Sequence, residues 1–516
     1  MAAIWYLYCS LIFSMLYFFT KRFSKKIENL PPRPFPCLPV IGHLHLLKQP
    51  IFKTLSEIAK KHGDLLLLQY GSRPVLLVSS PAAAEECFTT NDVACANRPR
   101  FLMTKHFAIN NTSLAWAPYG DHWRNLRRLV SLELLSSGRL QLLQWIRVNE
   151  VKSMVSSLIK RQNRPLDMRV VFFELTLNVM MMMIAGKRYV GDNITDAKEA
   201  KKFREIHGET FKIGGTMAIV DYIPWIKSWK LEKQMIELQK ERDAFMQNLI
   251  EERRRKMKSN RRDGESWKTL IDVILILQET DPEYYSDAMI RSLILVLILA
   301  GTDTTINTME WSLSLLLNHP EVLKKVQMEI DNQIGENKRL LEESDLPKLP
   351  FLRSIILESN RMYPPLPLLV PHETSKDCII GGFRVPSGTM ISTNAWAIQN
   401  DPNTWEDPRS FKPERHKSSV GFPELGGRDG FKLMPFGSGR RGCPGEALAV
   451  RTVGLALGTL IQCFDWSRVG EEMVDMTEAI AFSLQKGEPL QAKCKPRAIM
   501  AKFLSQEKLF SITDIY

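Results

Sequence analysis

One cysteine in a glycine-rich loop is the residue of this 516-residue sequence with the clearest potential for chemistry. Cys443 lies near the end of the stretch FGSGRRGCPG, 436–445, and apolar residues recur at helical spacing in the stretch that follows, 446–464. Amide groups at a helix N-terminus and a nearby guanidinium stabilise a thiolate relative to a thiol, and Arg441 lies two residues before the sulfur. Because the four glycines of the loop let the backbone approach a flat partner closely, the loop predicts a buried metal thiolate at Cys443.

Two other interpretations of this loop compete with a metal thiolate. Gly437, Gly439 and Gly442 formally match the dinucleotide fingerprint, with Asp465 as the nominal ribose acid. A true fingerprint closes a β-strand, and Pro435 interrupts the short run in which that strand would lie, so this interpretation is disfavoured. The second alternative, a glycine turn that begins a helix with a core cysteine, stays open when the loop is taken alone.

A second candidate site interrupts a long apolar helix, in which the run LILVLILA, 293–300, is followed by GTDTT, 301–305. Buried hydroxyl and carboxyl groups must be satisfied, so a buried helix seldom carries them without a function. Gly301 removes a side chain where something bulky must pass, while Asp303 and Thr304 offer an acid and a hydroxyl beside it. A helix kink is the alternative. The eight apolar residues before the glycine are too few for a membrane span.

Two further pairs of residues lie at helical spacing. Trp123 and Arg127 are four residues apart, hence on one helical face, and an indole N–H together with a guanidinium can bind carboxylates. Taken alone, this pair also fits a basic surface helix with a half-buried tryptophan. Glu358 and Arg361 lie at i and i+3 of a predicted helix. On a surface, such an ion pair would contribute under about 1 kcal/mol.

Together these motifs resemble those of the cytochrome P450 monooxygenases, and the resemblance covers essentially the whole chain. The pattern F-x-x-G-x-R-x-C-x-G, filled by Phe436, Gly439, Arg441, Cys443 and Gly445, is similar to the haem-ligand loop of that family. The family holds its haem iron by a cysteine thiolate, so the resemblance implies Cys443 as the iron ligand of haem b, with Phe436 and Arg441 in contact with the cofactor. It also implies a mainly α (α+β) cytochrome P450 fold, a helix-rich domain with small β-sheets and an N-terminal membrane anchor helix.

The resemblance further implies roles for residues outside the cysteine loop. The stretch AGTDTT, 300–305, resembles the oxygen-binding helix of the family, in which Asp303 and Thr304 would relay protons to dioxygen. A W-x-x-x-R motif of the family binds a haem propionate, which implies that role for Trp123 and Arg127, with His372 as a further propionate donor. The residues expected to line the substrate pocket are Ala300, Gly301, Leu368, Leu369, Val370 and Phe482.

A structural triad is implied in the same way. Glu358 and Arg361, with Arg415 of the later stretch FKPERH, resemble the E-x-x-R plus P-E-R triad of the family and would lock the core behind the cysteine loop. His416 stands where the commonest form of this motif has an aromatic residue.

The surrounding elements can be predicted more simply from residue patterns. Two short strands are expected at 65–70 and 73–79, joined at Gly71. Residues 165–260 are mostly helical by period, and Met180 to Met183 are expected to be ordinary buried packing.

The N-terminal residues predict a membrane anchor. Residues 2–20 carry no charge and provide roughly 28 Å of helix, enough to cross a hydrocarbon core. Basic residues follow directly, which places the larger part of the chain in the cytosol. We therefore expect a transmembrane signal anchor at 1–21, a basic and proline-rich hinge at 22–45, and a haem-thiolate monooxygenase domain at 46–516. The expected localisation is the endoplasmic reticulum membrane, as a single-pass protein in contact with membrane lipid.

Composition limits the class of partner. The formal net charge of +12 suits an anionic membrane surface or an acidic protein. The densest basic run, 253–262, has no interleaved aromatic residues, so nucleic-acid binding is not expected. The eight cysteines include no C-x-x-C pair, which argues against a zinc cluster or a disulfide framework and fits a reducing compartment.

The resemblance implies a monooxygenase that inserts one oxygen atom of O2 into a C–H bond of a small hydrophobic substrate. Since no FAD or NADPH fingerprint stands up in the sequence, the electrons of NADPH are expected to arrive through a separate NADPH–cytochrome P450 reductase. The stretches 178–189 and 435–446 resemble those of the plant subfamily that includes isoflavone hydroxylases, so a phenolic or isoflavonoid substrate is expected. A terpenoid or a lignan is the alternative substrate. A haem-thiolate isomerase and a non-enzymatic haem protein that binds small molecules are alternatives of other classes.

Overall fold

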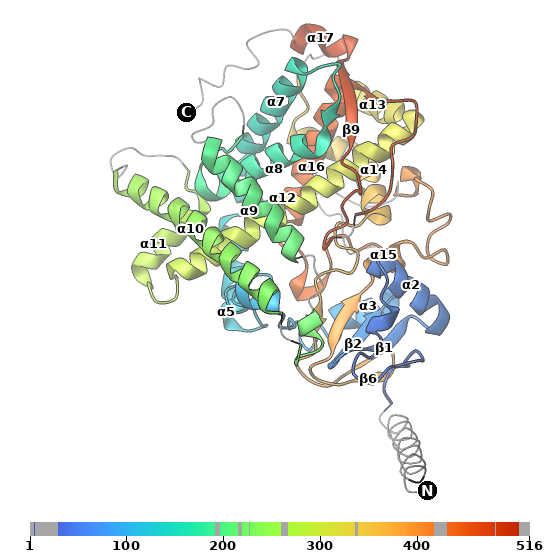
Figure 1. The fold of residues 1–516 in the computed structure, drawn as a ribbon. Helices are drawn as coiled ribbons and strands as arrows, with labels where there is room; N and C mark the ends of the chain where they lie inside the picture. Colours follow the sequence, from blue (N-terminus) through green and yellow to red (C-terminus); the bar gives the residue numbers. More distant parts are fainter. Residues whose placement is uncertain are drawn as a thin grey trace.

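The computed structural model describes Trp5 and residues 29–190, 197–214, 219–226, 228–259, 267–335, 339–416, 431–479 and 481–504. These residues form a large helical body and a smaller β-rich lobe (Figure 1). Apart from Trp5, the predicted anchor at 1–21 lies outside the described residues, as does the first part of the hinge.

The β-rich lobe is built on a four-stranded sheet with the strand order β1-β2-β7-β4. Leu65 pairs with Val78 at one end of the antiparallel β1/β2 hairpin, and the hairpin turns at Gly71, whose φ is +53°. This confirms the two predicted strands, because a left-handed backbone at the turn favours glycine. The sheet consists of β1 (Leu65–Tyr70), β2 (Arg73–Val78), β7 (Met390–Thr393) and β4 (His372–Glu373), and α2 (Ile51–His62), α3 (Pro81–Phe88) and α15 (Ala395–Gln399) lie beside it (Figure 1).

The described part of the hinge packs against this lobe. His43 is fully buried; its Nε2 lies 2.9 Å from the carbonyl oxygen of Pro34, and its Nδ1 accepts a hydrogen bond from the backbone N–H of Gln69. Leu67 of β1 donates its backbone N–H to the carbonyl of Pro32. Residues 29–45 are therefore tied to the first strand of the sheet.

Two smaller sheets complete the β structure. One is the hairpin of β5 (Cys378–Ile380) and β6 (Phe383–Val385), and the other has the order β3-β9-β8. In the latter, Leu166 pairs with Ala492, so segments from opposite halves of the chain lie side by side. Its strands are β3 (Leu166–Asp167), β9 (Gln491–Pro496) and β8 (Phe464–Arg468).

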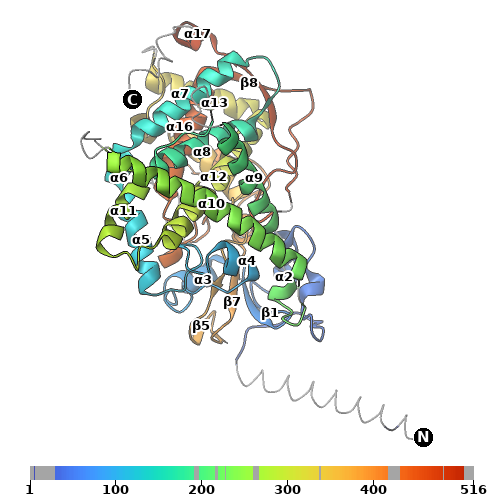
Figure 2. The same ribbon diagram turned by 60° about the vertical axis from the view of Figure 1, so that its left-hand side comes forward.

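The 32-residue helix α12 (Asp287–Asn318) organises the helical body, where it contacts α8, α10, α14 and α16. Ser286 caps its N-terminus by accepting a hydrogen bond from the backbone of Met289. Figure 2 shows α10 crossing the front of the body beside α9. The other helices of the body are α4 (Leu102–Phe107), α5 (Asp121–Glu133), α6 (Ser137–Leu142), α7 (Gln144–Lys160), α8 (Met168–Ala185), α9 (Ala197–Gly214), α10 (Trp229–Ser259), α11 (Leu270–Thr280), α13 (Pro320–Ile334), α14 (Pro350–Met362), α16 (Glu446–Cys463) and α17 (Ala498–Leu504).

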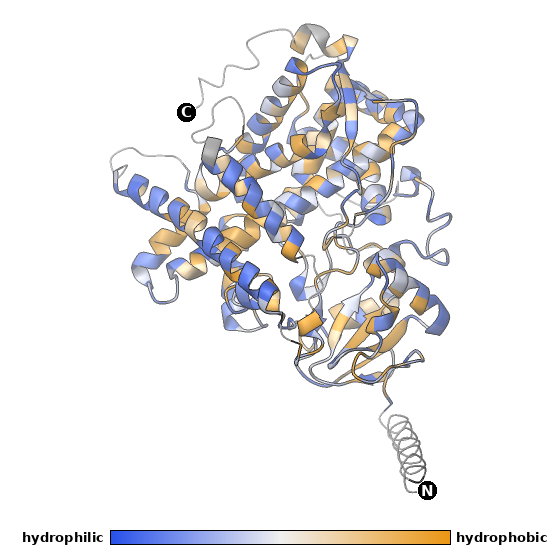
Figure 3. Ribbon diagram, viewed as in Figure 1, coloured by the Kyte–Doolittle hydropathy of each residue, from blue (hydrophilic) through white to orange (hydrophobic). Residues whose placement is uncertain are grey.

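Three of the described helices, α8, α12 and α16, are long and apolar enough to cross a membrane by length and composition alone. Most of each apolar window is buried inside the protein, and Figure 3 shows apolar colouring on these inner helices and polar colouring on the outer helix α10. The prediction that the helix around 293–305 is buried nearly all round is confirmed, as is the buried packing of Met180 to Met183.

Short 3₁₀ turns complete the described elements and lie mainly in loops. They are η1 (Leu44–Leu46), η2 (Ile219–Asp221), η3 (Glu343–Lys348), η4 (Pro413–His416) and η5 (Gly439–Arg441).

Candidate active site

A cavity of about 270 Å³, the inner cavity, lies between α12 and the cysteine loop. Its wall is mostly apolar and includes parts of α5, α8 and α14. Cys443, Phe436 and Arg441 of the cysteine loop line it, and so do Trp123 and Arg127. The structure thus brings together the cysteine, the predicted cofactor contacts and the middle of α12.

The cysteine loop is held by backbone hydrogen bonds and by its glycines. The backbone N–H of Cys443 donates to the carbonyl of Phe436 at 2.9 Å, and α16 begins three residues later. Gly439 has a φ of +67°, and an added Cβ would lie 2.8 Å from the carbonyl oxygen of Phe88 and 2.7 Å from Asp92 Oδ1. The absence of a side chain at Gly439 therefore lets the cysteine loop pack closely against Phe88, the last residue of α3, and against Asp92.

The surroundings of Cys443 shift the pKa of its thiol in opposite directions. Burial, the largest influence, raises the pKa of Cys443, while the backbone N–H groups of Gly445 and Glu446 at the start of α16 and the Arg127 guanidinium lower it. Arg127 also donates a hydrogen bond of 2.7 Å to the carbonyl of Gly442. Protein surrounds the cysteine, and the accessible side of Cys443 lines the cavity. A group inside the cavity could therefore contact the sulfur directly.

Arg441 lines the cavity, and two of its three guanidinium nitrogens donate hydrogen bonds to backbone carbonyls. Its Nε donates to the carbonyl of Ala96 and its Nη2 to that of Ala117, and its guanidinium lies 4.4 Å from the ring centre of Trp123. Nη1 is buried and has no hydrogen-bond partner among the residues that the structure describes. The indole N–H of Trp123 donates to the carbonyl of Leu114 at 3.1 Å, so in this structure the ring supports Arg441. The predicted bond from Trp123 to a propionate stays a prediction.

Two further cationic or potentially cationic groups adjoin Arg441. Arg98 is buried and donates to the carbonyls of Ala115, Val370 and Pro371. His372 Nδ1 pairs with the carbonyl of Cys95 at 2.8 Å, and its ring lines the cavity. Burial lowers the pKa of Arg98 and of His372, and the neighbouring guanidinium groups lower both further.

Arg441 is affected in the same way, since burial and Arg127 lower its pKa to about 10. Within the described part of the chain, Arg98, Arg127 and Arg441 form no ion pair with a carboxylate, although all three line the cavity. The sequence did not indicate that Arg98 lines this cavity, because Arg98 lies in no recognisable motif.

Helix α12 presents a hydroxyl to the cavity and turns its carboxylate away from it. Ala300, Gly301 and Thr304 line the cavity, and the Thr304 hydroxyl donates to the carbonyl of Ala300 at 2.7 Å. An added Cβ at Gly301 would lie 2.6 Å from Met180 Sδ, so the bulky group that passes the glycine is a side chain of α8. Met180 itself lines the cavity, a role that its place in a run of methionines did not indicate.

Asp303 lies behind this wall. Its buried carboxylate accepts hydrogen bonds from the Ser483 hydroxyl, from Gln485 Nε2 at 3.1 Å and from Asn307 Nδ2 at 3.3 Å. The partners Ser483 and Gln485 come from the segment between β8 and β9, which the sequence could not place against α12.

The predicted pocket residues divide between two cavities. Val370 and Leu369 line the inner cavity, whereas Leu368 and Phe482 line a separate cavity of about 210 Å³, the outer cavity. The outer cavity lies between α2, the four-stranded sheet and the segment that includes Phe482. Leu369 belongs to both walls.

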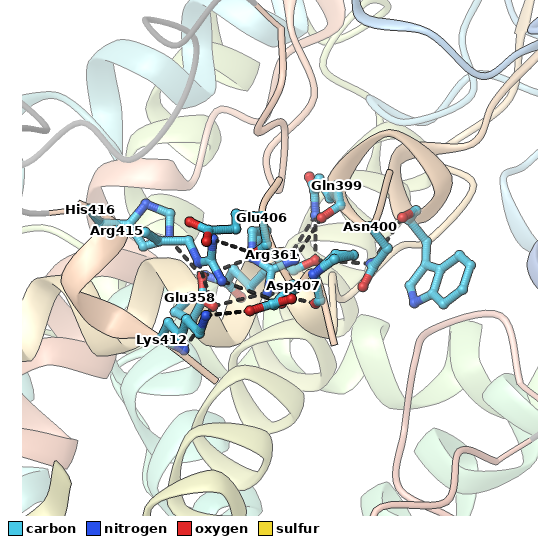
Figure 4. Close-up of polar contacts among 12 residues, drawn as sticks. Glu358, Arg361, Gln399, Asn400, Glu406, Asp407, Lys412, Arg415 and His416 are labelled. Atoms are coloured by element: carbon cyan, nitrogen blue, oxygen red, sulfur yellow. Dashed lines mark hydrogen bonds and ion pairs between the residues drawn. The ribbon is translucent and has the colours of Figure 1, made fainter. Parts of the chain in front are cut away.

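The expected triad is assembled as an extended buried network (Figure 4). Arg361 donates to both carboxylate oxygens of Glu358, at 2.8 and 2.9 Å, and Arg415 Nε donates to Glu358 Oε1 at 3.0 Å. His416 Nε2 lies 2.9 Å from Glu358 Oε2. Burial alone would raise the pKa of Glu358, but hydrogen bonds from His416 and Arg361 and the charge of Arg361 outweigh it and lower this pKa to about 2.

Gln399 connects this network to the irregular segment just before the cysteine loop. Arg361 Nη1 donates to the Gln399 carbonyl at 2.8 Å, and the Gln399 side chain accepts the backbone N–H of Met434 at 2.9 Å. Its amide donates to the carbonyl of Asn360. The triad can therefore hold the cysteine loop in position from behind.

The family model described as Cytochrome P450 matches residues 32–491. The chain belongs to the cytochrome P450 family. A zebra fish cytochrome P450 solved with progesterone has a TM-score of 0.75 at 26% identity, and the match covers 87% of this chain and 100% of that chain. The prediction of a mainly α cytochrome P450 fold with small sheets is confirmed.

Several plant cytochromes P450 are similar along almost the whole chain. Cytochrome P450 81Q32 of Catharanthus roseus is 49% identical, and the match covers 94% of this chain and 95% of the relative. Isoflavone 3'-hydroxylase of Medicago truncatula is 46% identical, with 92% and 93% covered. The (+)-piperitol/(+)-sesamin synthase CYP81Q2 of Sesamum radiatum is 44% identical, with 94% of each covered. The chain is thus a plant-type P450 monooxygenase, which uses haem, a redox partner, O2 and a small-molecule substrate.

The residues of the inner cavity fit a haem group on independent grounds. A cysteine sulfur faces an apolar cavity, and three guanidinium groups without a carboxylate partner among the described residues adjoin the same space. Nη1 of Arg441 is buried and has no partner within the described part of the chain, so it needs an acceptor, which a propionate would provide.

Proposed function

We propose that this P450 hydroxylates a flat plant phenolic of the isoflavonoid type. The observation that carries the proposal is the 42–46% identity, over more than nine-tenths of the chain, to relatives named as isoflavone 2'- and 3'-hydroxylases. The α12 side of the inner cavity, where the apolar residues Val296, Leu297 and Ala300 surround the Thr304 hydroxyl, suits a small aromatic substrate.

Cys443 holds the haem iron in this proposal, and its sulfur is prepared by the α16 amides and Arg127. Arg441, Arg98 and His372 hold the propionates, Trp123 supports the Arg441 guanidinium from its ring face, and Phe436 packs against the cofactor. Bound haem supplies the activation of O2, and a thiolate ligand favours cleavage of the O–O bond. The apolar wall excludes water and orients the C–H bond that is attacked.

Asp303 and Thr304 deliver protons to the inner cavity in this proposal. The Asp303 carboxylate lies behind the cavity wall, where the half-buried Gln485 connects it toward the surface. We propose that Asp303 takes up protons on this side and swings toward the cavity, where the Thr304 hydroxyl passes them on. General acid catalysis of this kind contributes about 10²–10⁴-fold, so Asp303→Asn should lower kcat by at least about 10²-fold. An unchanged kcat and an unchanged solvent isotope effect in Asp303→Asn would contradict this proton route.

Electrons reach the protein from NADPH–cytochrome P450 reductase in this proposal. The predicted anchor at 1–21 holds the chain in the endoplasmic reticulum membrane as a single-pass protein, with the domain at 46–516 in the cytosol. The proposal rests on the uncharged stretch 2–20, on the basic residues that follow it and on the formal net charge of +12.

The test uses the full-length protein in membranes with a plant reductase and NADPH. A carbon monoxide difference spectrum of the dithionite-reduced protein should show the thiolate-type Soret band, which Cys443→Ala should abolish. Cys463→Ala is the matched control, because Cys463 lies at the far end of α16, outside the cavity wall, and this variant should retain the band. Isoflavones should then be hydroxylated.

A lignan is the second candidate substrate, because the sesame relative is named as (+)-piperitol/(+)-sesamin synthase. The same assay with isoflavones, lignans and terpenoids side by side separates the candidates. Turnover of lignans but not of isoflavones would reject the isoflavonoid proposal and favour this alternative.

A further inference from the structure

A buried polar cluster centred on Asn307 lies on α12 outside the wall of the inner cavity. Asn307 follows Asp303 by one helical turn, and both side chains are buried. Its Nδ2 donates to Asp303 Oδ2 at 3.3 Å, and its Oδ1 accepts a hydrogen bond of 3.1 Å from Nη2 of Arg169, a residue of α8. Asn307 therefore connects the Asp303 carboxylate to a guanidinium on another helix.

Arg169 fixes the orientation of the Asn307 amide. A guanidinium donates hydrogen bonds and accepts none, so the amide oxygen must face Arg169 and the amide nitrogen must face Asp303. Arg169 is itself held, because its Nη1 donates at 2.6 Å to Oε2 of Glu310, whose side chain has no exposed surface. The other oxygen of Glu310 accepts the backbone N–H of Leu490 at 2.9 Å. A chain of hydrogen bonds thus determines that a donor faces Asp303.

Arg169 is the cation that Asn307 contacts in this cluster. His207 of α9 is buried near Arg169, and burial lowers the pKa of His207 to about 4, although the charge of Asp303 acts in the opposite direction. The His207 ring is therefore neutral at neutral pH. Lys486 acts on Glu310 by its charge, and burial lowers the pKa of this lysine. The positive charge that reaches Asp303 through Asn307 comes from Arg169.

This arrangement distinguishes the two protonation states of Asp303. A hydrogen bond to an ionised carboxylate is about twice as strong as one to a neutral carboxyl group. The Asn307 amide and the Arg169 charge therefore hold Asp303 firmly while it is ionised and weakly after it takes up a proton. The Ser483 hydroxyl, in contrast, can donate to the ionised form or accept from the protonated form, so it does not distinguish the two.

We propose that Arg169 and Asn307 are positioning residues that form a charge-selective latch on Asp303. The latch keeps the ionised carboxylate outside the inner cavity and releases it once a proton taken up on the Gln485 side has neutralised it. Asp303 then turns toward Thr304 with a proton and returns to the latch after it has given the proton up. The inference rests on the proposed function, because it deepens the proton route through Asp303.

Crystal structures of the full-length haem protein at neutral pH test the latch directly. Asn307→Leu has a similar volume and removes the hydrogen bonds to both Asp303 and Arg169. The Asp303 carboxylate should contact Ser483 in the wild type and turn toward the inner cavity in this variant. An Asp303 that keeps its contacts with Ser483 and Gln485 in Asn307→Leu would overturn the latch.

Turnover of an isoflavone in membranes with reductase and NADPH tests the consequence for proton delivery. Asn307→Leu and Arg169→Gln should each lower kcat about tenfold with little change in KM, because an ionised carboxylate that turns to the cavity carries no proton. The solvent isotope effect on kcat should rise in both variants. In an Asp303→Asn background, each substitution should lower kcat by less than about twofold. Tenfold losses that persist in that background would show that Arg169 and Asn307 act without Asp303, and would overturn the latch.

Arg254→Gln is the matched control. Arg254 also pairs with a carboxylate of α12, at 2.7 Å, but this carboxylate belongs to Asp287 in the first turn of the helix. The control should keep the wild-type kcat and solvent isotope effect, and equal losses in Arg254→Gln would overturn the specific role of Arg169.

The two kinds of measurement distinguish failure of this inference from failure of the proposed function. If Asp303→Asn lowers kcat but Asn307→Leu and Arg169→Gln do not, the latch falls and the proton route stands. If Asp303→Asn keeps the wild-type kcat while Asp303 turns in the Asn307→Leu crystals, the latch stands and the proton route falls. If no isoflavone is hydroxylated, the substrate proposal falls, and the crystal structures still decide the latch.

Discussion

Replacing Glu358 with glutamine should weaken the core behind the cysteine loop by a predictable amount. The carboxylate is fully buried and its pKa is lowered from 4.5 to about 2, which corresponds to about 3 kcal/mol of stabilisation at neutral pH. Glutamine keeps the shape but leaves Arg361 and Arg415 without their charge partner, and breaking a buried pair costs about 3–5 kcal/mol. In a body of this size, that loss lowers Tm by only about 3–5 °C, so urea unfolding is the sharper assay.

The pH dependence tests the cause of this loss. Because the pKa of Glu358 is lower in the folded state, its contribution is complete above pH 4.5 and disappears as the pH falls toward 2. The difference in unfolding free energy between wild type and Glu358→Gln should therefore shrink by about 1.4 kcal/mol between pH 6.5 and pH 3.5. Glu472→Gln, at an exposed position, should show neither the loss nor the pH dependence. A difference that is constant over this range would refute an electrostatic origin.

Three further substitutions test the packing and the cofactor contacts. Gly301→Ala should destabilise the fold by about 1–3 kcal/mol because the new Cβ meets Met180, and Met180→Ala should relieve most of that loss in a double-mutant cycle; additive losses would contradict this contact. Arg441→Gln should speed haem transfer to apomyoglobin roughly 10- to 100-fold, since a charged hydrogen bond is lost; an unchanged rate would exclude Arg441 as a propionate ligand. Gln399→Leu should cost about 1–3 kcal/mol in urea unfolding by leaving the Met434 N–H unpaired, and a neutral effect would show that the link to the cysteine loop is dispensable.

The sequence was sufficient for features that depend on local patterns. The hairpin at Gly71 follows from alternation of residues and a glycine turn, and the burial of α12 follows from its continuous apolar run. The pairing of Glu358 with Arg361 follows from helical spacing. The contribution of Arg415 and His416, however, depends on a return of the chain that only the family resemblance could suggest for Arg415.

The sequence could not predict which cavity wall each side chain of the site faces, because residue spacing does not specify the directions of individual side chains. Leu368 was expected in the substrate pocket with Leu369, but the structure places Leu368 in the wall of the outer cavity, whereas Leu369, whose φ is +52°, lines both cavities. Asp303 and Thr304 are neighbours on α12, and their side chains point about 100° apart around the helix axis. The carboxylate faces away from the cavity because its partners Ser483 and Gln485, which are distant in sequence, lie on that side together with Asn307.

The small sheet β3-β9-β8 has a consequence for how the protein is made. Leu166 of β3 pairs with Ala492 of β9, which is synthesised more than 300 residues later. Helix α16, which follows Cys443, is also among the last helices to be synthesised. During synthesis, most of the helical body therefore exists before either the cysteine loop or the closing strand is available. Haem capture and closure of the body are late and nearly simultaneous events. A chain interrupted before Gln491 would leave β3 and β8 with open edges, which invite aggregation.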